Sequence, residues 1–446
     1  MEKFSSYKDS GFAWMGQIPS HWDTRRFRFL LAENSVHNTE LKERKQLQFK
    51  YGDIVPKANQ SEDKDVLDTI KKYTVVAPGD IMINGLNLNY DFISQRVAQV
   101  QESGVITSAY VSLRPLEGAN SKYYSYYMKA MDAQKMFHGM GSGVRLTLSY
   151  DNLKNLFFPY PSPEEQEAIV AYLDAATAKI DEAIAQQQRM IDLLNERKQV
   201  IIDKAALHGL NPDVEMIDSG NDWIGLVPAH WRKNKFRYFF KTRTGITFTK
   251  AQLEDEGEPV ISYGQIHSKD NWGASVNPEL IRHIPASLTK GKDGVLAVQG
   301  DFLFADTSED FEGCGNNVFI DSEPVYAGYH TILAKKNNEE YGPYLAYLFT
   351  STGWRGQLRS MVNGVKVYSI TQTILNSANV VLPPVDEQKE IADYITERVV
   401  KLDEGVKRHK EFIKVLQERK QIIINDVVTG KVKVIVPMFE SQIKME

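Results

Sequence analysis

Two stretches of the chain space their apolar residues in the manner typical of long α-helices. In each stretch, apolar side chains recur at alternating intervals of three and four residues, the period of a coiled-coil seam. Prolines and acidic residues open each stretch and a glycine follows it, as expected at helix termini. The seam residues are Ile169, Leu173, Ala176, Ile180, Ala183, Ile191, Leu194, Ile201 and Ala205, and then Ile391, Ile395, Leu402, Val406, Ile413, Leu416, Ile423 and Val427.

The length of these two stretches distinguishes them from ordinary helices. A helix of about 45 residues, rising about 1.5 Å per residue, is about 65 Å long. Helices within globular domains are usually much shorter. An apolar seam of that length must be covered by another part of the protein. For each of the two helices, the segment of matching length is the other helix. The pattern therefore predicts that the two helices pack against each other.

The segments before the two helices show a different pattern. Short runs of aromatic and β-branched residues alternate with turn signals, such as Pro78-Gly79-Asp80 in the first segment, which predicts mixed α+β domains. No apolar run is long enough to cross a membrane, and the first residues lack the pattern of an export signal. We therefore expect a cytoplasmic protein with no membrane partner.

The chain is an internal duplication. Residues 9–22 (DSGFAWMGQIPSHW) return as residues 218–231 (DSGNDWIGLVPAHW), identical at eight of fourteen positions. Further matches follow along both copies, and the offset between matching residues rises from 209 to 222. The matches frame the segments between them, whereas residues 86–106 and 306–326 share almost nothing that can be aligned. Each copy thus consists of a globular domain followed by a long helix.

Composition and charge add little evidence for a partner. The chain has 53 basic and 58 acidic residues and a net charge of −5, so any DNA binding must come from local patches. A single cysteine, Cys314, excludes an internal disulfide and a cysteine-based zinc site, which suits a reducing compartment. We find no phosphate-binding loop, no adenine-methyltransferase tetrapeptide and no paired histidines at metal-ligand spacing. The sequence predicts a non-catalytic chain that binds neither a cofactor nor a metal.

The repeated motifs resemble those of a known family. The opening Asp-Ser-Gly-x2-Trp-x-Gly-x2-Pro-x-His-Trp and the Glu-Gln-x2-Ile lead into each helix are similar to the framing motifs of type I restriction-modification specificity subunits (the HsdS family). The resemblance covers essentially the whole chain. It implies double-stranded DNA, two modification (methyltransferase) subunits and restriction (helicase-nuclease) subunits as partners. It also implies that those subunits, and not this chain, use S-adenosylmethionine, ATP and Mg²⁺.

The resemblance also implies an architecture. Residues 1–158 and 211–380 are expected to be target recognition domains, 159–210 the first long helix, and 381–446 the second helix with a tail. The helices are expected to form an antiparallel coiled coil that acts as a spacer between the domains. Two similar units related by a pseudo-twofold axis suit two sites on a DNA duplex, because the two strands of the duplex run in opposite directions. Because the domains diverge between their framing motifs, the predicted target is bipartite and asymmetric.

Candidate DNA contacts come from basic clusters and glycine-containing loops. The first group lies just after the opening motif in each copy and suits phosphate binding, with a solvated strand flank as the alternative. The second group lies in a pair of equivalent loops that suit the reading of a DNA groove, and there Gln265 would pair with adenine. The alternative is that each of these loops is a turn at the edge of a strand. The third follows a Gly-Val pair. The groups are Arg25, Arg26, Arg28, Lys233, Lys235 and Arg237; Tyr51, Lys57, Tyr263, Gln265 and Lys269; and Arg145 and Lys366.

Two other functions remain open at this point. The duplicated domains would also suit a coiled-coil scaffold that binds proteins and never touches DNA. A recognition subunit of a type II-like restriction enzyme with a bipartite target is the nearer alternative. The tryptophans of the opening motif are predicted to be packing residues, and His21 and His230 are predicted to cap or bridge within the same motif.

Overall fold

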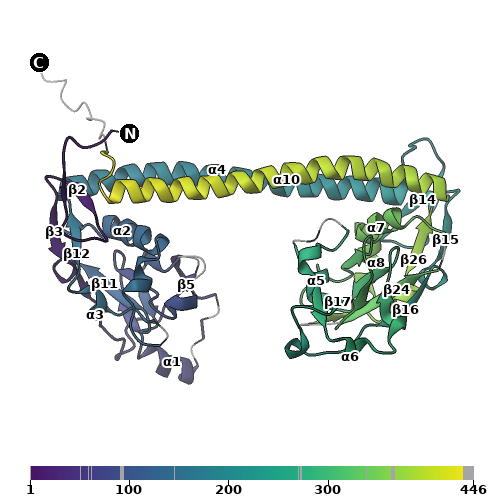
Figure 1. Ribbon diagram of the computed structural model, residues 1–446, viewed down its shortest axis with the longest axis horizontal. Coiled ribbons are helices and arrows are strands. Elements are labelled where there is room, and N and C mark those ends of the chain that lie inside the picture. Colours follow the sequence, from purple (N-terminus) through teal and green to yellow (C-terminus); the bar gives the residue numbers. More distant parts are fainter. Residues whose placement is uncertain are drawn as a thin grey trace, which may run out of the picture. The chain divides into compact units, whose positions relative to one another are not determined.

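The chain is described by a computed structural model (Figure 1), which covers residues 2–434 except 51, 59, 62, 91–94, 145, 270, 272–273, 338 and 363–366. It divides into two compact units. The first unit comprises Met1–Gln188 and Glu411–Glu446, and the second comprises Arg189–Lys410. Each unit therefore contains one globular domain and one half of each long helix. The division passes through the middle of the helices, whereas the four segments predicted from the sequence end at helix termini.

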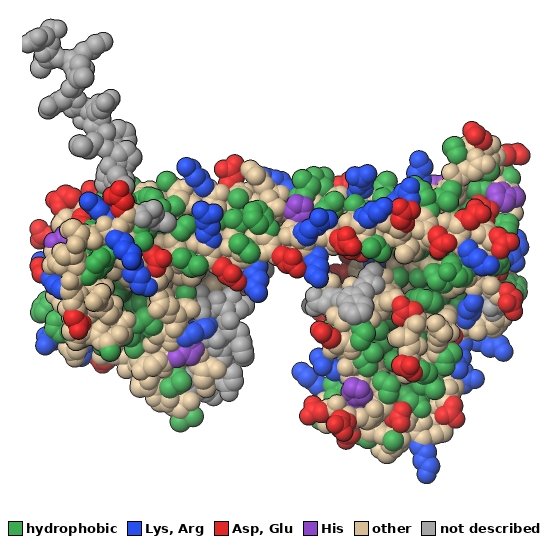
Figure 2. All heavy atoms as spheres, turned by 45° about the horizontal axis from the view of Figure 1, so that its top comes forward, with side chains coloured by type: hydrophobic (Ala, Val, Ile, Leu, Met, Phe, Trp, Pro, Cys, Tyr) green, Lys and Arg blue, Asp and Glu red, His purple; other side chains and the backbone are tan. Residues whose placement is uncertain are grey.

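The two predicted helices are present. Helix α4 spans Pro163–His208 and helix α10 spans Val385–Val428, 46 and 44 residues long. All the predicted seam residues are buried or half-buried, which confirms the coiled-coil pattern. Gly209 and Gly430 follow the helices with φ angles of 76° and 73°, a left-handed conformation that glycine adopts at helix ends. In Figure 2 the exposed side chains along these helices include hydrophobic ones between charged ones.

Within each unit the two helix halves run antiparallel. In the first unit, Nζ of Lys420 on α10 lies 2.7 Å from the carboxylate of Asp181 on α4. In the second unit, Nζ of Lys198 on α4 lies 2.7 Å from the carboxylate of Asp403 on α10. The two ion pairs are related by the sequence offset of 222. The amino-terminal half of one helix thus pairs with the carboxy-terminal half of the other, as predicted.

The first globular domain is built on a four-stranded antiparallel sheet with the order β4-β11-β8-β9 (Leu31–Glu33, Val111–Pro115, Ile81–Ile83, Val97–Gln99). Helix α2 (Ser121–Ala133) packs on this sheet, and its tyrosines lie in the core. The remaining strands form pairs: β1–β2 (Tyr7–Asp9, Gln17–Pro19), β3–β12 (Asp23–Arg26, Phe157–Tyr160), β5–β6 (Leu47–Lys50, Asp53–Pro56) and β7–β10 (Thr74–Val76, Gly104–Ile106). Helices α1 (Lys64–Ile70) and α3 (Tyr150–Leu153) complete the domain.

The second globular domain repeats this plan and adds a sheet. Its main sheet has the order β16-β24-β20-β22 (Phe240–Thr244, Thr331–Lys336, Phe302–Ala305, Asn317–Phe319), and its further sheet has the order β18-β17-β23-β19 (Arg282–Ile284, Glu258–Ile261, Val325–Ala327, Leu296–Ala297). Strand pairs are β13–β14 (Met216–Asp218, Leu226–Pro228), β15–β26 (Arg232–Lys235, Asn379–Leu382) and β21–β25 (Thr307–Ser308, Tyr368–Ser369). The helices are α5 (Tyr263–Ile266), α6 (Ala286–Thr289), α7 (Gly342–Thr350), α8 (Thr352–Ser360) and α9 (Gln372–Ser377).

The repeated opening motif attaches each domain to the first turn of a long helix. Trp22 and Trp231 are buried, and their indole N–H groups donate to Glu165 and Glu387 at 3.3 and 3.1 Å. Nε2 of His21 lies 2.8 Å from the same Glu165 carboxylate, and the His230–Glu387 pair has the same distance. Packing and bridging are therefore the structural roles of these residues, as predicted. The other two tryptophans are less enclosed: Trp14 is half-buried beside Phe158, and Trp223 is exposed.

A buried tyrosine ties each domain to the end of the other copy's helix. The hydroxyl of Tyr123 on α2 donates to the carbonyl of Val428 at the end of α10, at 3.0 Å. The hydroxyl of Tyr344 on α7 donates to the carbonyl of Ala206 near the end of α4, at 2.9 Å. Because both rings are fully buried, each bond satisfies a terminal helix carbonyl that water cannot reach. The framing contacts therefore fix each domain against both helices of its unit.

Candidate nucleic-acid interface

The second domain has a polar groove of about 430 Å³ at one end of its main sheet. The groove lies where the end of β16 meets the β21–β25 pair and the turn before β24. Its lining residues are Thr244, Asp306, Thr307, His330, Ile332, Ser369, Ile370, Thr371 and Gln372. Seven of these nine residues carry a hydroxyl, amide, carboxylate or imidazole group, and these are the groups with which proteins read the edges of bases.

Aromatic side chains flank the groove. The ring centres of Tyr329 and His330 lie 4.0 Å apart, and the ring of Tyr263 lies 5.6 Å from His330. Tyr329 is exposed, so its ring is available to a ligand. Aromatic rings next to hydrogen-bonding groups are a frequent combination in nucleic-acid-binding proteins, because they provide apolar contact without sequence preference.

Two arginines of α8 form a cationic site beside the same β21–β25 pair. Nη2 atoms of Arg355 and Arg359 both donate to the backbone carbonyl of Glu312, and Arg359 also approaches the Glu312 carboxylate at 3.3 Å. Arg359 lies over the ring of Phe311, which in turn contacts Tyr368 of β25. Burial, and secondarily the neighbouring Arg359, lowers the pKa of Arg355 to about 10, so the Arg355 guanidinium is charged at neutral pH. This arrangement suits a phosphate.

These arginines were not among the residues predicted from the sequence. Arg355 and Arg359 are one helical turn apart and stand in no basic run, so their pattern is that of any amphipathic helix. Only the packing of α8 against the 310–316 loop brings them to the groove region. The i, i+4 spacing of two arginines was the one signal available.

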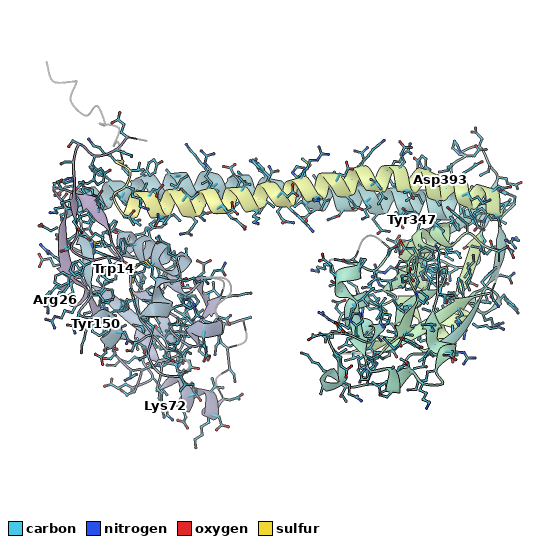
Figure 3. The ribbon with its side chains drawn as sticks, in the orientation of Figure 1. Trp14, Arg26, Lys72, Tyr150, Tyr347 and Asp393 are labelled. Atoms are coloured by element: carbon cyan, nitrogen blue, oxygen red, sulfur yellow. The ribbon has the colours of Figure 1, made fainter. Side chains whose placement is uncertain are left out.

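The basic clusters that follow the opening motif are engaged locally. The guanidinium carbon of Arg25 lies 3.6 Å from the ring centre of Tyr160, that of Arg26 lies 5.4 Å from Phe157, and Arg28 donates to Asn155. These partners belong to or precede β12, the strand that leads into α4. Figure 3 labels Arg26, which ends β3, the strand that pairs with β12. The first cluster therefore lies on the β3–β12 pair and not on the main sheet.

The equivalent cluster of the second copy behaves in the same way. Lys233 donates to the carbonyl of Asp218 at 2.9 Å, Lys235 donates to Asn379 at 2.7 Å, and Arg237 lies over Tyr238. Arg237 and Lys233 are exposed. These contacts favour the alternative interpretation, a solvated strand flank, while the exposed guanidinium and ammonium groups leave phosphate contact as a prediction.

The paired loops differ between the copies. Tyr51 lies outside the described residues, and Lys57 is half-buried with its ammonium 5.9 Å from the ring centre of Tyr73. In the second copy the expected turn is the one-turn helix α5, which carries Tyr263 and Gln265. Lys269 follows it and is exposed.

Gln265 has a structural role that bears on its predicted one. Its Oε1 accepts a hydrogen bond from the backbone N–H of Ser262 at 2.9 Å and thereby caps α5. Bidentate pairing with adenine requires both the oxygen and the nitrogen of the amide. The oxygen is already engaged, so adenine pairing by Gln265 would break the cap.

The loops that carry Arg145 and Lys366 are only partly described, and both of these residues lie outside the described part. On the first loop, Ser142 and Thr147 form a β-bridge, and Val144 between them is 98% exposed. A loop tip that presents a fully exposed valine projects from the domain. In the second domain the corresponding loop leads directly into β25 and hence into the groove.

At the place of the groove, the first domain presents other side chains. Ile83 lies opposite Val111 in the first main sheet, and Phe304 lies opposite Ile332 in the second. The two sheets therefore align when 221 is added to the residue numbers of the first domain. Equivalent pairs at the sheet end are then Gly85 and Asp306, Leu86 and Thr307, Ser108 and Tyr329, and Ala109 and His330. Ser108 is exposed and donates to the carbonyl of Lys72, which Figure 3 labels. The same backbone position thus carries different chemistry in the two domains.

Among the described residues, no group of three or more histidine, cysteine, aspartate or glutamate residues is placed to hold a metal ion. Within the same part of the chain, no helix is both long enough and apolar enough to span a membrane.

Known proteins resemble this chain over most of its length. The putative type I restriction enzyme MjaX specificity subunit of Methanocaldococcus jannaschii is 23% identical over 96% of this chain and 98% of that protein. The MjaVIII specificity subunit of the same organism is 22% identical over 81% of each chain. A solved structure concerned with complex assembly and conformational transition of the type I R-M system shares the fold. It has a TM-score of 0.63 and 14% identity, and covers 93% of this chain and 99% of that one.

The sequence also matches a family directly. The type I restriction modification DNA specificity domain matches twice, at residues 34–189 and 228–409. Each match includes most of one globular domain and somewhat more than half of the helix that follows it, so the duplication coincides with a repeat of the family's domain. The chain therefore belongs to the family of type I restriction-modification DNA specificity proteins.

Proposed function

We propose that this type I specificity subunit recognises an asymmetric, bipartite target in double-stranded DNA, with one half-site bound by each globular domain. One observation supports this proposal above all others. The Trp–Glu, His–Glu and Tyr–carbonyl contacts that frame the domains recur in both copies, with distances that differ by 0.2 Å or less. The residues at the sheet ends are different. Two domains that are attached in the same way but present different side chains at the ends of their sheets suit two different half-sites.

The chain itself acts without catalysis in this proposal. It positions two adenine-methylating modification subunits, and with them the restriction subunits, on the target. The partner subunits supply S-adenosylmethionine, ATP and Mg²⁺ chemistry, and this chain binds none of these. The long helices then serve as the spacer that relates the two half-sites.

Exposed apolar residues on the helices are the surface that we propose for the modification subunits. Met190, Leu193 and Val200 of α4 are 44%, 57% and 59% exposed. Phe412, Val415 and Ile422 of α10, each at an offset of 222, are 48%, 54% and 59% exposed. We call these sets the α4 stripe and the α10 stripe. The second unit carries the α4 stripe and the first unit the α10 stripe, which matches one modification subunit per unit.

The proposed function is tested by deleting the gene and sequencing the methylome. We expect methylated adenines in one bipartite, asymmetric motif to disappear from the deletion strain and to return when the gene is restored. An unchanged methylome would favour the scaffold alternative. Loss of a motif in a host whose complex lacks a separate restriction subunit would favour the type II-like alternative.

Placing glutamates in the α4 stripe should remove one of the two modification subunits. Leu193→Glu with Val200→Glu puts charge where an apolar surface is buried, and each buried apolar side chain contributes about 1.5–3 kcal/mol. We expect native mass spectrometry of the complex to show a single modification subunit. Asn195→Glu, on the same helix but outside the stripe, is the matched control. Retention of both subunits by the double variant would show that partners bind elsewhere.

A further inference from the structure

His330 occupies an unusual backbone conformation at the groove of the second domain. It lies in the turn between β23 and β24 with a φ of 55°, the left-handed region that few residues other than glycine adopt. Histidine is among the residues that tolerate this region, but the conformation is costly and persists where the surrounding structure holds it. Residues held in this way are frequently functional.

Hydrogen bonds hold the imidazole as well as the backbone. Nδ1 of His330 lies 2.8 Å from Oδ1 of Asp306 and 3.1 Å from Oγ1 of Thr307, and the Thr307 hydroxyl donates to the same carboxylate oxygen at 2.7 Å. The backbone N–H of Asp306 donates to the carbonyl of His330, and that of Ile370 donates to the carbonyl of Asp306. Asp306 and Thr307 thus hold the ring, and Ile370 holds the backbone of Asp306, so the orientation of the ring is fixed before any ligand binds.

The other ring nitrogen is left for a ligand. Because the carboxylate of Asp306 accepts the proton on Nδ1, the neutral ring presents an acceptor at Nε2. Nε2 has no hydrogen-bond partner among the residues that the structure describes. The ring lines the groove, and its side chain is 37% exposed. Because Nε2 is a hydrogen-bond acceptor held in one place in an open groove, it suits a ligand that donates a hydrogen bond.

We propose that His330, positioned by Asp306 and Thr307, reads one base pair of the half-site bound by the second domain. This proposal rests on the proposed function. In the major groove the available donors are the amino groups at N6 of adenine and N4 of cytosine. Nε2 accepts from one of these, while Tyr329 and Tyr263, whose rings are next to the imidazole and 6.4 Å from each other, provide apolar contact. Ala109 and Ser108 stand at the equivalent positions of the first domain, so this contact belongs to one half-site alone.

His330→Asn tests the proposal in the assembled complex of specificity and modification subunits. Asparagine also tolerates a positive φ, so the turn is retained while the imidazole is lost. The target found by methylome sequencing is synthesised with single adenines replaced by purine and single cytosines by pyrimidin-2-one, which removes one amino group at a time. We expect one position, in one half-site, where the wild-type complex loses on the order of 10-fold in affinity and His330→Asn loses nothing further.

Controls separate this contact from a defect of folding. His283→Asn changes a histidine of the same unit that does not line the groove, and it should retain wild-type discrimination at every position. Asp306→Ala should weaken discrimination at the same base pair as His330→Asn, because it frees the ring. The thermal unfolding midpoint of each variant, and its affinity for DNA without the target, are measured alongside and should match the wild type.

The outcomes are distinct. Identical base discrimination by His330→Asn and wild type overturns the proposal, and so does an effect confined to guanine or present in both half-sites. If His330→Asn lowers the thermal unfolding midpoint, the proposal is tested with Asp306→Ala instead. Full wild-type base discrimination by Asp306→Ala then overturns the proposal. A wild-type complex with no sequence-specific target would instead overturn the proposed function itself.

Discussion

Inserting one heptad into each long helix, between Gln188 and Arg189 and between Lys410 and Glu411, is expected to lengthen the DNA spacer by about three base pairs. Each insertion adds about 10 Å at about 1.5 Å per residue, and base pairs are about 3.4 Å apart. A seven-residue block keeps the apolar seam in register. The ion pairs Lys198–Asp403 and Lys420–Asp181 each lie within one unit and are retained.

The insertion also rotates one half-site by roughly 100° around a duplex of about 10.5 base pairs per turn. The complex must absorb this rotation by twisting or by deforming the DNA. Methylome sequencing should therefore show either the same half-sites with a spacer longer by about two to four base pairs, or loss of specific methylation with the fold retained. Full methylation of the original motif with its original spacer would show that the helices do not set the spacing. Insertion of a heptad in one helix alone, which makes the two helices unequal in length so that the contacts at both ends cannot be kept, is the control for unfolding.

Exchanging residues 34–149 for the matching segment of a related specificity subunit should change one half of the methylated motif and leave the other half and the spacer unchanged. The exchange keeps Trp22, Glu165 and both helices, and Tyr123 is retained in the incoming segment so that its bond to Val428 persists. Because three of the four strands of the main sheet (β8, β9 and β11) and the reading positions at the sheet end lie inside the segment, recognition should move with it. The reciprocal exchange in the second domain should alter the other half.

The readout of this exchange is again the methylome. A motif that changes in both halves would mean that the domains read DNA jointly and not separately. An unchanged motif would place recognition outside residues 34–149 and would exclude the sheet end of the first domain as a reading surface.

The fold was largely predictable from the sequence because its signals are periodic or repeated. The apolar period alone identified both helices, and Gly209 and Gly430 marked their ends. The repeated opening motif identified the buried tryptophans Trp22 and Trp231. These predictions hold because an apolar seam or a large aromatic side chain must be buried whatever the rest of the chain does.

The candidate interface was far less predictable. A basic run such as Arg25-Arg26-x-Arg28 has the same sequence whether it contacts DNA or stacks on Tyr160. Gln265 carries both groups needed to pair with adenine, yet its oxygen caps α5. Local sequence lists the hydrogen-bonding groups of a segment but not the neighbours that already occupy them.

By itself, the sequence determined the duplication, the two long helices and the mixed α+β domains, since these depend on the period of apolar residues and on motifs that recur in the same order in both copies. The tertiary structure alone decided which side chains meet at the groove. Asp306, His330 and Ile370 come from three separated segments, and they converge because β20 pairs with β24 and β21 with β25 in one register. The pairing of Arg355 and Arg359 over Glu312 has the same origin. Long-range strand register and helix packing set these positions, and no local pattern encodes them.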